Sequence, residues 1–407
     1  MTFTAYDTAG RLITGSGITN PAVWPLAPGA QLASLDTEIF GAGLAAMDTV
    51  GWFKLESTSA QTAGFFLAFN GSLDVQDGAD ATVKTMTDFI LPEVEAPPGF
   101  TQVFLANPGM TAATIGLELV GSDGRTVATV TRLLGASGVL AEDITTLFPS
   151  ASITGNEYLR GTSNQGVVPF EFLGKTGQYV QGMNGQELSG GATTVYSPQY
   201  VIGGSWWTAL SVVNLQNVRA SAIAKFVKED GTLLGTKTID LAPSGKAHIT
   251  AQDFFVTPPS SGLLQGYVEI TAAPVRVGGS VVFGDPARAA FSSALPLMSQ
   301  GLTSAVFSQV ASDPTYYTGL AVVNPSLVPA VALLQIFDDE GHLVKSGPVT
   351  IGAKSRSSGL LTQYFTDLPS MSAGYFTLKS ESSLMSFAMF GTNSLSTLSA
   401  VPPQIGP

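Results

Sequence analysis

The sequence contains no cysteine among its 407 residues. This absence excludes disulfide bridges, thiolate metal sites and cysteine nucleophiles together. Histidine is also scarce, because only His248 and His342 are available for acid–base chemistry near neutral pH. The sequence has no nucleophile elbow, Gly-rich phosphate loop or paired-histidine metal motif. It therefore predicts a protein that is not an enzyme and that uses no cofactor and no metal.

Charged residues are also few. They make up 12% of the chain, about half the usual share of about 25%, whereas 44% of the residues are apolar. Such a composition argues against disorder and predicts a surface of uncharged polar residues, which suits secreted, wall-associated or assembled proteins. The net charge is −12 and no cluster of four basic residues occurs. We therefore expect no nucleic-acid partner.

Long apolar runs and a leader sequence are missing too. No run reaches the roughly 18 residues of a membrane helix, so we expect a chain that does not span a membrane. The first residues, "MTFTAYDTAG", lack the basic start and apolar core of a signal peptide. The expected location is extracellular or at the cell surface, with any signal peptide absent from this chain.

The sequence does contain a clear internal repeat. Three copies share five landmarks in the same order, and two of the spacings are identical. The landmarks are an Asn, a Gly 17 positions later in an acidic turn, a Phe 24 positions after that Gly, an aromatic that starts a strand, and a Phe near a Gly. In chain order they are Asn107, Gly124, Phe148, Tyr158 and Phe172 with Gly174; Asn214, Gly231, Phe255, Tyr267 and Phe283 with Gly284; and Asn324, Gly341, Phe365, Tyr375 and Phe390 with Gly391.

The N-terminal stretch carries the last four landmarks, at Gly10, Phe40, Trp52, and Phe69 with Gly71. Successive turn glycines lie 107 to 114 residues apart, which is too long for a solenoid unit and matches a small domain. We therefore divide the chain into four repeats. They are an incomplete first repeat (1–82), a second (83–190), a third (191–299) and a fourth (300–407).

Within each repeat the apolar residues alternate with polar ones, which is typical of strands with one buried face. The acidic-Gly pair ends one strand and starts its hairpin partner. One stretch before a Pro, such as "VLAEDITTLFP", lacks this alternation and predicts a helical turn or crossover loop. About seven strands per repeat without long helices predict an all-β fold, a tandem array of antiparallel immunoglobulin-like β-sandwiches. A propeller blade is the alternative, although blades are usually shorter.

The first repeat lacks about 30 residues relative to the others, equivalent to two strands, because Met1 falls level with Ile115. Such a sandwich would expose core side chains and unpaired backbone groups. Three explanations are open: a fragment of a longer protein, a strand supplied by another copy of the chain to build a fibre, or a first repeat adapted as an incomplete cap. We expect an assembly edge at Phe3, Ala5 and Tyr6.

The acidic turns "GSDG", "KEDG" and "FDDEG" have two interpretations. Calcium prefers six to eight oxygen ligands, and these turns offer only one to three acids. Asp-Gly before a second strand is what a tight hairpin needs, because Gly tolerates a positive φ. We therefore favour hairpin geometry over calcium sites.

Aromatic pairs mark the strand that precedes the Asn in two repeats, at Trp206 with Trp207 and at Tyr316 with Tyr317. Neighbouring strand residues point to opposite faces, so one ring of each pair could be exposed and grip a sugar. The alternative is that one ring enters the core and the other packs on the neighbouring repeat. The Asn itself is better interpreted as a turn residue than as a ligand.

Two segments, "TGLAVVNPSLVPAVALLQIFDDEGHLV" and "GYFTLKSESSLMSFAMFG", resemble a tandem β-sandwich repeat that is common in large secreted and surface proteins of bacteria. The resemblance covers nearly the whole chain and implies export and a modular extracellular role, with no catalytic residues to transfer. We expect a structural protein, such as a stalk, surface-layer or fibre subunit formed as a rigid rod. Its expected partners are other copies of itself or other surface proteins. The alternative is an adhesion or carbohydrate-binding module for polysaccharide, and a two-carboxylate glycosidase is a third hypothesis.

Overall fold

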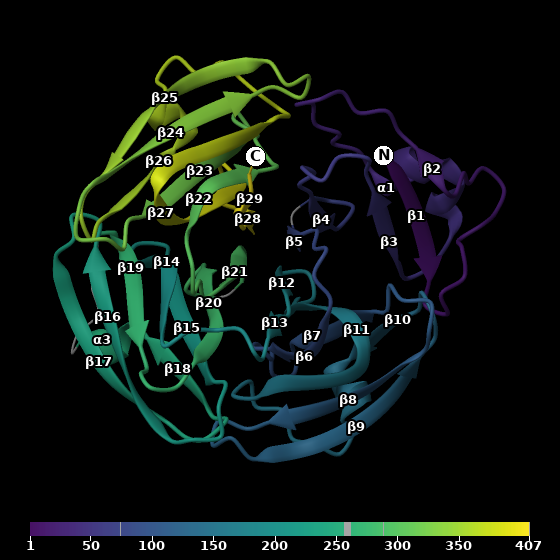
Figure 1. Cartoon of the computed structure of the whole chain (residues 1–407), viewed down its shortest axis with the longest axis horizontal. Coiled ribbons are helices and arrows are strands. Elements are labelled where there is room, and N and C mark those ends of the chain that lie inside the picture. The colour runs from purple at the N-terminus through teal and green to yellow at the C-terminus, as the bar shows by residue number, and fades with distance from the viewer. Residues whose placement is uncertain (74, 256–261, 288, 407) are drawn as a thin grey trace.

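The four repeats form a closed ring in the computed structural model, which describes residues 1–73, 75–255, 262–287 and 289–406 (Figure 1). The first repeat meets the second on one side and the fourth on the other. The chain is all-β, as predicted, and its sheets are antiparallel. No helix among the described residues is long and apolar enough to cross a membrane.

Repeats 2 and 4 have the same strand arrangement, two sheets that share one long strand. The strands of repeat 2 are β6 (Met86–Leu91), β7 (Phe100–Ala106), β8 (Ala113–Val120), β9 (Thr126–Leu134), β10 (Val139–Asp143), β11 (Tyr158–Lys175), β12 (Tyr179–Asn184) and β13 (Gln186–Glu187). Those of repeat 4 are β22 (Leu302–Phe307), β23 (Tyr316–Val323), β24 (Ala330–Phe337), β25 (Leu343–Ile351), β26 (Arg356–Leu360), β27 (Tyr375–Thr392), β28 (Leu398–Val401) and β29 (Gln404–Ile405). The shared strands, β11 and β27, each run without interruption from the landmark aromatic to the landmark Phe and its Gly.

Repeat 3 keeps the two segments apart as β19 and β20, because a turn that contains Pro274 lies between them, closed by a hydrogen bond from the Val275 N–H to the Ala272 carbonyl. Its outer sheet has the order β14-β19-β16-β17 and its inner sheet β18-β15-β20-β21. The strands are β14 (Thr194–Ile202), β15 (Trp207–Asn214), β16 (Ala220–Lys228), β17 (Leu233–Leu241), β18 (Lys246–Thr250), β19 (Leu264–Thr271), β20 (Val277–Gly284) and β21 (Ser292–Pro296). Each repeat is thus a sandwich of one outer sheet and one inner sheet.

The stretch predicted as a helical turn is one short helix in each repeat, and the landmark Phe lies at its C-terminal end. These helices are α1 (Asp36–Phe40), α2 (Ile144–Leu147), α3 (Ala251–Phe254) and α4 (Leu361–Tyr364), with a 3₁₀ turn η1 (Ala42–Ala46) after the first. The Pro-containing end of the third stretch, residues 256–261, lies outside the described residues.

The first repeat is the smallest. Its outer sheet has the order β2-β1-β3, and its inner sheet is a single hairpin of β4 and β5. The strands are β1 (Thr2–Asp7), β2 (Ala22–Val23), β3 (Gly51–Glu56), β4 (Phe65–Phe69) and β5 (Gln76–Asp80). Its core contains five buried residues, whereas that of repeat 2 contains seventeen. The predicted absence of two strands is therefore a real deficit in packing.

Neighbouring repeats meet through the acidic-Gly turn. In every case the carbonyl two positions before the turn Gly accepts a hydrogen bond from a backbone N–H of the next repeat, at 2.8 to 3.2 Å. The pairs are Val139 to Thr8, Lys246 to Ser122, Arg356 to Glu229, and Gln31 to Asp339. The last of these joins repeat 4 back to repeat 1. The same contact therefore occurs four times and closes the ring.

The turn glycines are required at this contact for two reasons. Each has a φ between 80° and 88°, which favours glycine. A Cβ on Gly124 would also lie 1.8 Å from the carbonyl oxygen of Pro243, and one on Gly341 would lie 2.5 Å from that of Gly29. The receiving turn is left-handed as well, at Ser137, Ser244, Lys354 or Gly29. Two tight turns therefore interlock at each boundary.

The other landmarks support the same boundary. Tyr158 and Tyr267 donate their hydroxyls to the left-handed residue of the next repeat, at 2.8 and 2.9 Å, and Trp52 donates its indole N–H to Ser137 at 2.7 Å. Each landmark Asn binds the receiving loop of its own repeat; the Asn107 amide, for example, donates to Gly135 at 2.9 Å. The interpretation of the Asn as a turn residue is confirmed.

The ring differs from the rigid rod expected for a single chain. Alternation and repeat length define each sandwich but carry no information about the angle between neighbours. That angle is set by the interlocking turns, which rotate each repeat relative to the last until the fourth meets the first. The units are therefore arranged around an axis and not along a line.

We predict that Gly124→Ala destabilises the protein through the contact between repeats 2 and 3. The strained φ and the clash with Pro243 together should lower the free energy of unfolding by about 3 kcal/mol, measured by urea denaturation. Gly177→Ala is the matched control, because Gly177 has a φ of 71° but nothing within 4 Å of an added Cβ. It should cost only about 1 kcal/mol. Equal losses in the two variants would show that the interlock contributes nothing.

Candidate functional site

One inner strand from each repeat reaches the axis of the ring, where β5, β12, β21 and β28 pack around one another (Figure 1). Equivalent positions on these strands, one per repeat, are polar and buried: Asp77, Gln181, Ser293 and Ser399. The Asp77 carboxylate accepts hydrogen bonds from Ser399 Oγ at 2.6 Å, from Ser293 Oγ at 3.0 Å and from the Gly182 N–H at 3.1 Å. A single carboxyl group thus joins all four repeats.

Burial decides the ionisation of this group. Asp77 is 1% exposed, and loss of solvent raises its pKa from an ordinary value of 3.8 to about 7. The hydrogen bonds from Ser399, Gly182 and Ser293 act in the opposite direction, because they stabilise the charged form. Neighbouring Gln181 donates to Ser292, and within the described residues its own Oε1 has no hydrogen-bond partner. The axis is therefore a closed polar centre that holds the repeats together.

We predict that protonation of Asp77 stabilises the fold. The folded pKa lies above the unfolded one, so the folded state binds more protons between about pH 4 and pH 7, and stability falls as the pH rises through this window. The shift corresponds to a loss on the order of 4 kcal/mol above pH 7. The measurement is urea unfolding at pH 5 and pH 8 for the wild type and for Asp77→Asn.

Asp77→Asn keeps the size of the side chain and one acceptor oxygen, but it cannot titrate. It should lose less stability than the wild type between the two pH values. Glu171, which is buried and has a raised pKa, is present in both proteins and cancels in this comparison. Identical pH profiles would show that Asp77 does not titrate in this range.

The four aromatic residues predicted to bind a ligand lie in two different repeats and take part in packing. Trp206 packs edge-on against Phe291 with ring centroids 5.2 Å apart, and Tyr316 stacks on Phe390 at 5.3 Å. Tyr317 is 8% exposed and belongs to the core of repeat 3, the neighbouring repeat. Trp207, which starts β15, is half-buried. The packing alternative describes Tyr317 correctly, and the pairs do not form one shared site.

The expected assembly edge at Phe3, Ala5 and Tyr6 is not an edge. These residues lie in β1, which pairs with β3 on one side and with β2 on the other. Beyond β2, the Asn20 side chain bonds both the N–H and the carbonyl of Ala5, at 3.0 and 2.7 Å. Residues 11–24 therefore take the role that β9 has in repeat 2, and the sequence prediction placed the missing strands on the wrong side of the sheet.

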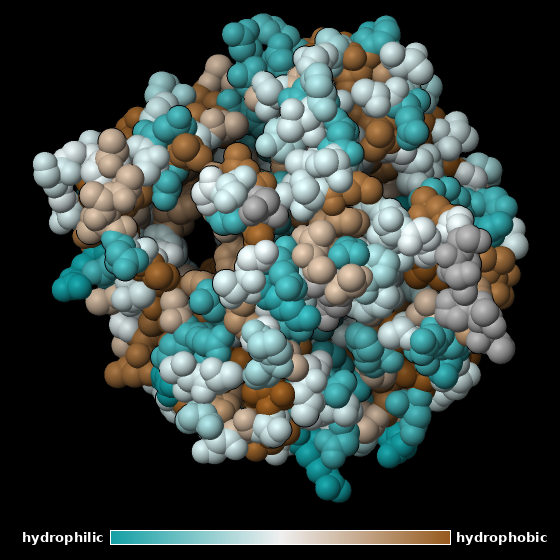
Figure 2. Space-filling model, turned by 180° about the vertical axis from the view of Figure 1, so that it is seen from behind, coloured by the Kyte–Doolittle hydropathy of each residue, from teal (hydrophilic) through white to brown (hydrophobic). Residues whose placement is uncertain are grey.

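The open side of the first repeat lies at β3 and β4. Among the described residues, β3 pairs only with β1 and β4 only with β5, whereas the equivalent strand β11 has neighbours on both sides. Figure 2 shows an opening through this side of the ring, between the first repeat and the centre. Phe53 is 47% exposed here, although its equivalents Leu159, Val268 and Phe376 are all 0% exposed.

The next repeat differs at the same place. In three interfaces a polar side chain donates to a carbonyl in or directly after the first strand of the preceding repeat: Lys246 to Pro92 at 2.8 Å, Arg356 to Pro198 at 3.0 Å, and Gln31 to Ser308 at 2.7 Å. The equivalent residue that faces the first repeat is Val139, which is buried and apolar. The sequence of repeat 2 therefore matches a neighbour without that carbonyl.

The acidic turns are hairpins, as the favoured interpretation predicted. Asp123 and Asp230 use their side-chain oxygens to accept a backbone N–H two residues later, at 3.0 and 2.9 Å. His342 lies in such a turn beside Asp338, with 3.3 Å between the ring nitrogen and a carboxylate oxygen. Among the described residues no group of three His, Asp or Glu side chains is placed to hold a metal ion.

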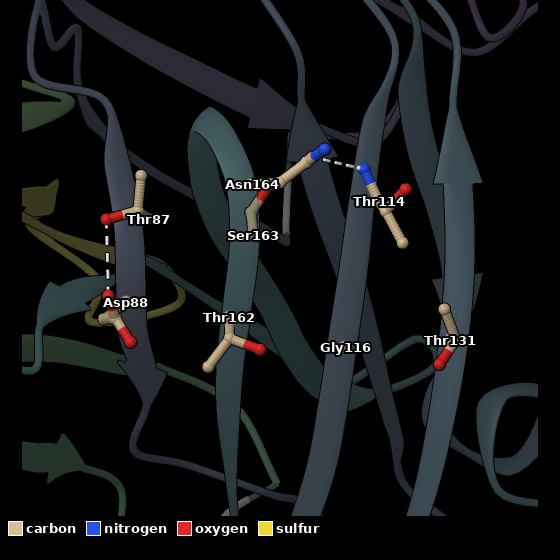
Figure 3. A pocket seen from close by; sticks show the side chains of 8 residues that line it. All are labelled: Thr87, Asp88, Thr114, Gly116, Thr131, Thr162, Ser163 and Asn164. Atoms are coloured by element: carbon tan, nitrogen blue, oxygen red, sulfur yellow. Dashed lines mark hydrogen bonds between the residues drawn. The ribbon is translucent and has the colours of Figure 1, made fainter.

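The outer sheet of repeat 2 carries a shallow polar depression of about 430 Å³ (Figure 3). It is lined by Thr87, Asp88, Thr114, Gly116, Thr131, Thr162, Ser163 and Asn164. The Asn164 side chain accepts a hydrogen bond from the Thr114 N–H at 2.7 Å across two strands. These residues offer hydroxyl, amide and carboxylate groups, but their set contains no aromatic ring for stacking and no base beside a nucleophile.

Comparisons with known proteins leave the family open. No protein-family model and no curated protein matches the chain. A structure described as Thermotoga maritima 1070 is 13% identical with a TM-score of 0.23 and covers 25% of this chain and 95% of its own. A structure of Sulfolobus Turreted Icosahedral Virus is 9% identical with a TM-score of 0.17 and covers 86% and 91%. Likenesses this low carry no argument about function.

Proposed function

We propose that the protein is a non-enzymatic structural protein of the cell exterior, a subunit of a surface layer, stalk or fibre. One observation carries the proposal: the turns, aromatics and Asn residues that recur from repeat to repeat make contacts between and within repeats. In a binding or catalytic protein, recurrent side chains would be expected to converge on an accessible cleft. The low charge of 12% and the resemblance to tandem surface repeats also support it.

A ring-shaped subunit favours a layer or a stacked fibre over a thin stalk, because a disc offers two broad faces and a rim for contacts. The open edges of β3 and β4 add a place where a strand from another chain could pair by β-augmentation. The proposed partners are accordingly other copies of the chain or other surface proteins.

We predict that protein from its native source forms regular assemblies in negative-stain electron microscopy. The repeat spacing should correspond to one ring. The control is the same material after dilution into mild denaturant, which should release single rings. A uniform field of isolated rings in native material, over the full range of concentration at which the protein occurs, would contradict a structural role.

The alternative function, adhesion to carbohydrate through exposed aromatics, is tested separately. Because Trp206 packs against Phe291 and Tyr317 lies in a core, we expect no glycan-array binding that depends on these rings. Polysaccharide binding that disappears in Trp206→Ala or Trp207→Ala, while the melting temperature stays within a few degrees, would instead establish the carbohydrate function.

A further inference from the structure

The open side of the first repeat is bordered by the edges of two strands, β3 and β4, and by residues 82–84, and each of the three has a counterpart that is paired elsewhere in the ring. In repeat 2 the first strand, β6, lies between β11 and β13, and the second, β7, lies between β11 and β10. In the first repeat β3 and β4 correspond to the two halves of β11. Residues 82–84 correspond to β13, and Val83 among them is fully exposed.

The backbone groups of these edges point into the opening. The carbonyl of Ala5 accepts from the Ile13 N–H, so its cross-strand partner Phe53 directs its own N–H and carbonyl away from β1. Leu55 does the same two residues later. In β4, the bond from the Ala81 N–H to the Gly64 carbonyl fixes the alternation, so Leu67 also faces outward. The two edges present a row of unpaired donors and acceptors.

From these edges we infer that the first repeat is an acceptor for two antiparallel strands of a separate polypeptide, one strand for each sheet. This inference rests on the proposed structural function and names the kind of partner. Three strand pairs of this chain fill the equivalent position in the other repeats and show which sequence the occupant needs. They are β6–β7, β14–β15 and β22–β23. Each pair consists of an apolar first strand, a short connection, and a second strand that runs to the landmark Asn.

A second copy of the chain is a poorer occupant. The described first and second strands of repeats 2 to 4 are all paired within their own sheets, so donating one pair would open another repeat. Among the described residues after β28, β29 already pairs with β22. Val139 adds a condition, because it offers no hydrogen bond to a carbonyl that follows the occupant's first strand. The carbonyl after the first strand of the occupant therefore has to be satisfied by solvent or by the occupant itself and not by residue 139.

The test adds a synthetic peptide of residues 302–324, which contains β22 and β23, to the full chain. Native mass spectrometry should show one peptide per chain. Hydrogen exchange of residues 51–56, 65–69 and 82–84 should slow at least tenfold. A scrambled peptide of the same composition should do neither. Failure of the 302–324 peptide to bind would overturn the inference, as would protection confined to other repeats.

Variants separate backbone pairing from apolar packing. Phe53→Pro removes an outward N–H and should weaken peptide binding at least tenfold, whereas Phe53→Ala keeps the N–H and should weaken it less. The matched control is Ser346→Pro in β25, an edge strand that already carries Pro348 at an outward position. It should bind the peptide as the wild type does. Equal binding by Phe53→Pro and the wild type would also overturn the inference.

The protein could instead self-associate in the absence of peptide, with hydrogen-exchange protection of a donor segment in a second copy. That result would overturn the separate partner and identify the occupant as a second copy of this chain. The proposed function and the acceptor site can fail independently. Native layers or fibres without peptide binding would leave the structural role intact and remove the acceptor. Peptide binding without any native assembly would keep the acceptor and remove the structural role.

Discussion

The structure depends on one backbone hydrogen bond that is repeated four times, from an N–H that follows a left-handed turn to a carbonyl in the acidic turn of the preceding repeat. A backbone contact of this kind needs no particular side chain, but it needs glycine where two main chains approach within the space of a Cβ. It also sets the angle between repeats. The ring, the meeting of four inner strands at its axis and the burial of Asp77 all follow from that angle.

The same geometry explains why the centre is polar. Four strands that converge on an axis bring their backbones and short side chains together. A fully apolar centre would leave the hydrogen-bonding groups that converge there unpaired. Asp77 accepts three hydrogen bonds from three different repeats, and two serines supply two of them. The group therefore holds the ring together while its own charge opposes burial.

Local features were predictable from the sequence. The repeats, the alternation of the strands, the hairpins at the acidic turns and the short helices depend on residues near one another in the chain. Register was less secure: the landmarks Phe283 and Phe390 pair with Thr208 and Thr318, whereas the equivalent Thr101 pairs with Leu173 and not with Phe172. A Phe one position away from the equivalent residue is easily aligned with it in a sequence, but its side chain points to the opposite face of the sheet.

The features with most bearing on function depend on distant contacts. Asp77 is an ordinary acid in an unremarkable segment, and only its three partners, more than a hundred residues away, make it special. The deficit of two strands was visible, but the side on which it lies was not, because residues 11–24 cover β1. One sequence signal could have located the open side. Val139 stands where the other described interfaces have a polar donor, such as Lys246 or Arg356.

Closure of the ring between Gln31 and Asp339 has a mechanical consequence. In a linear array, tension passes through every unit and every joint in series, so the weakest joint limits the whole. In a ring, any two repeats are joined by two arcs, and a pulling force divides between them. Rupture of one joint leaves a four-unit chain that is still connected and can close again. Closure therefore lets the molecule lose one joint and keep all four repeats connected.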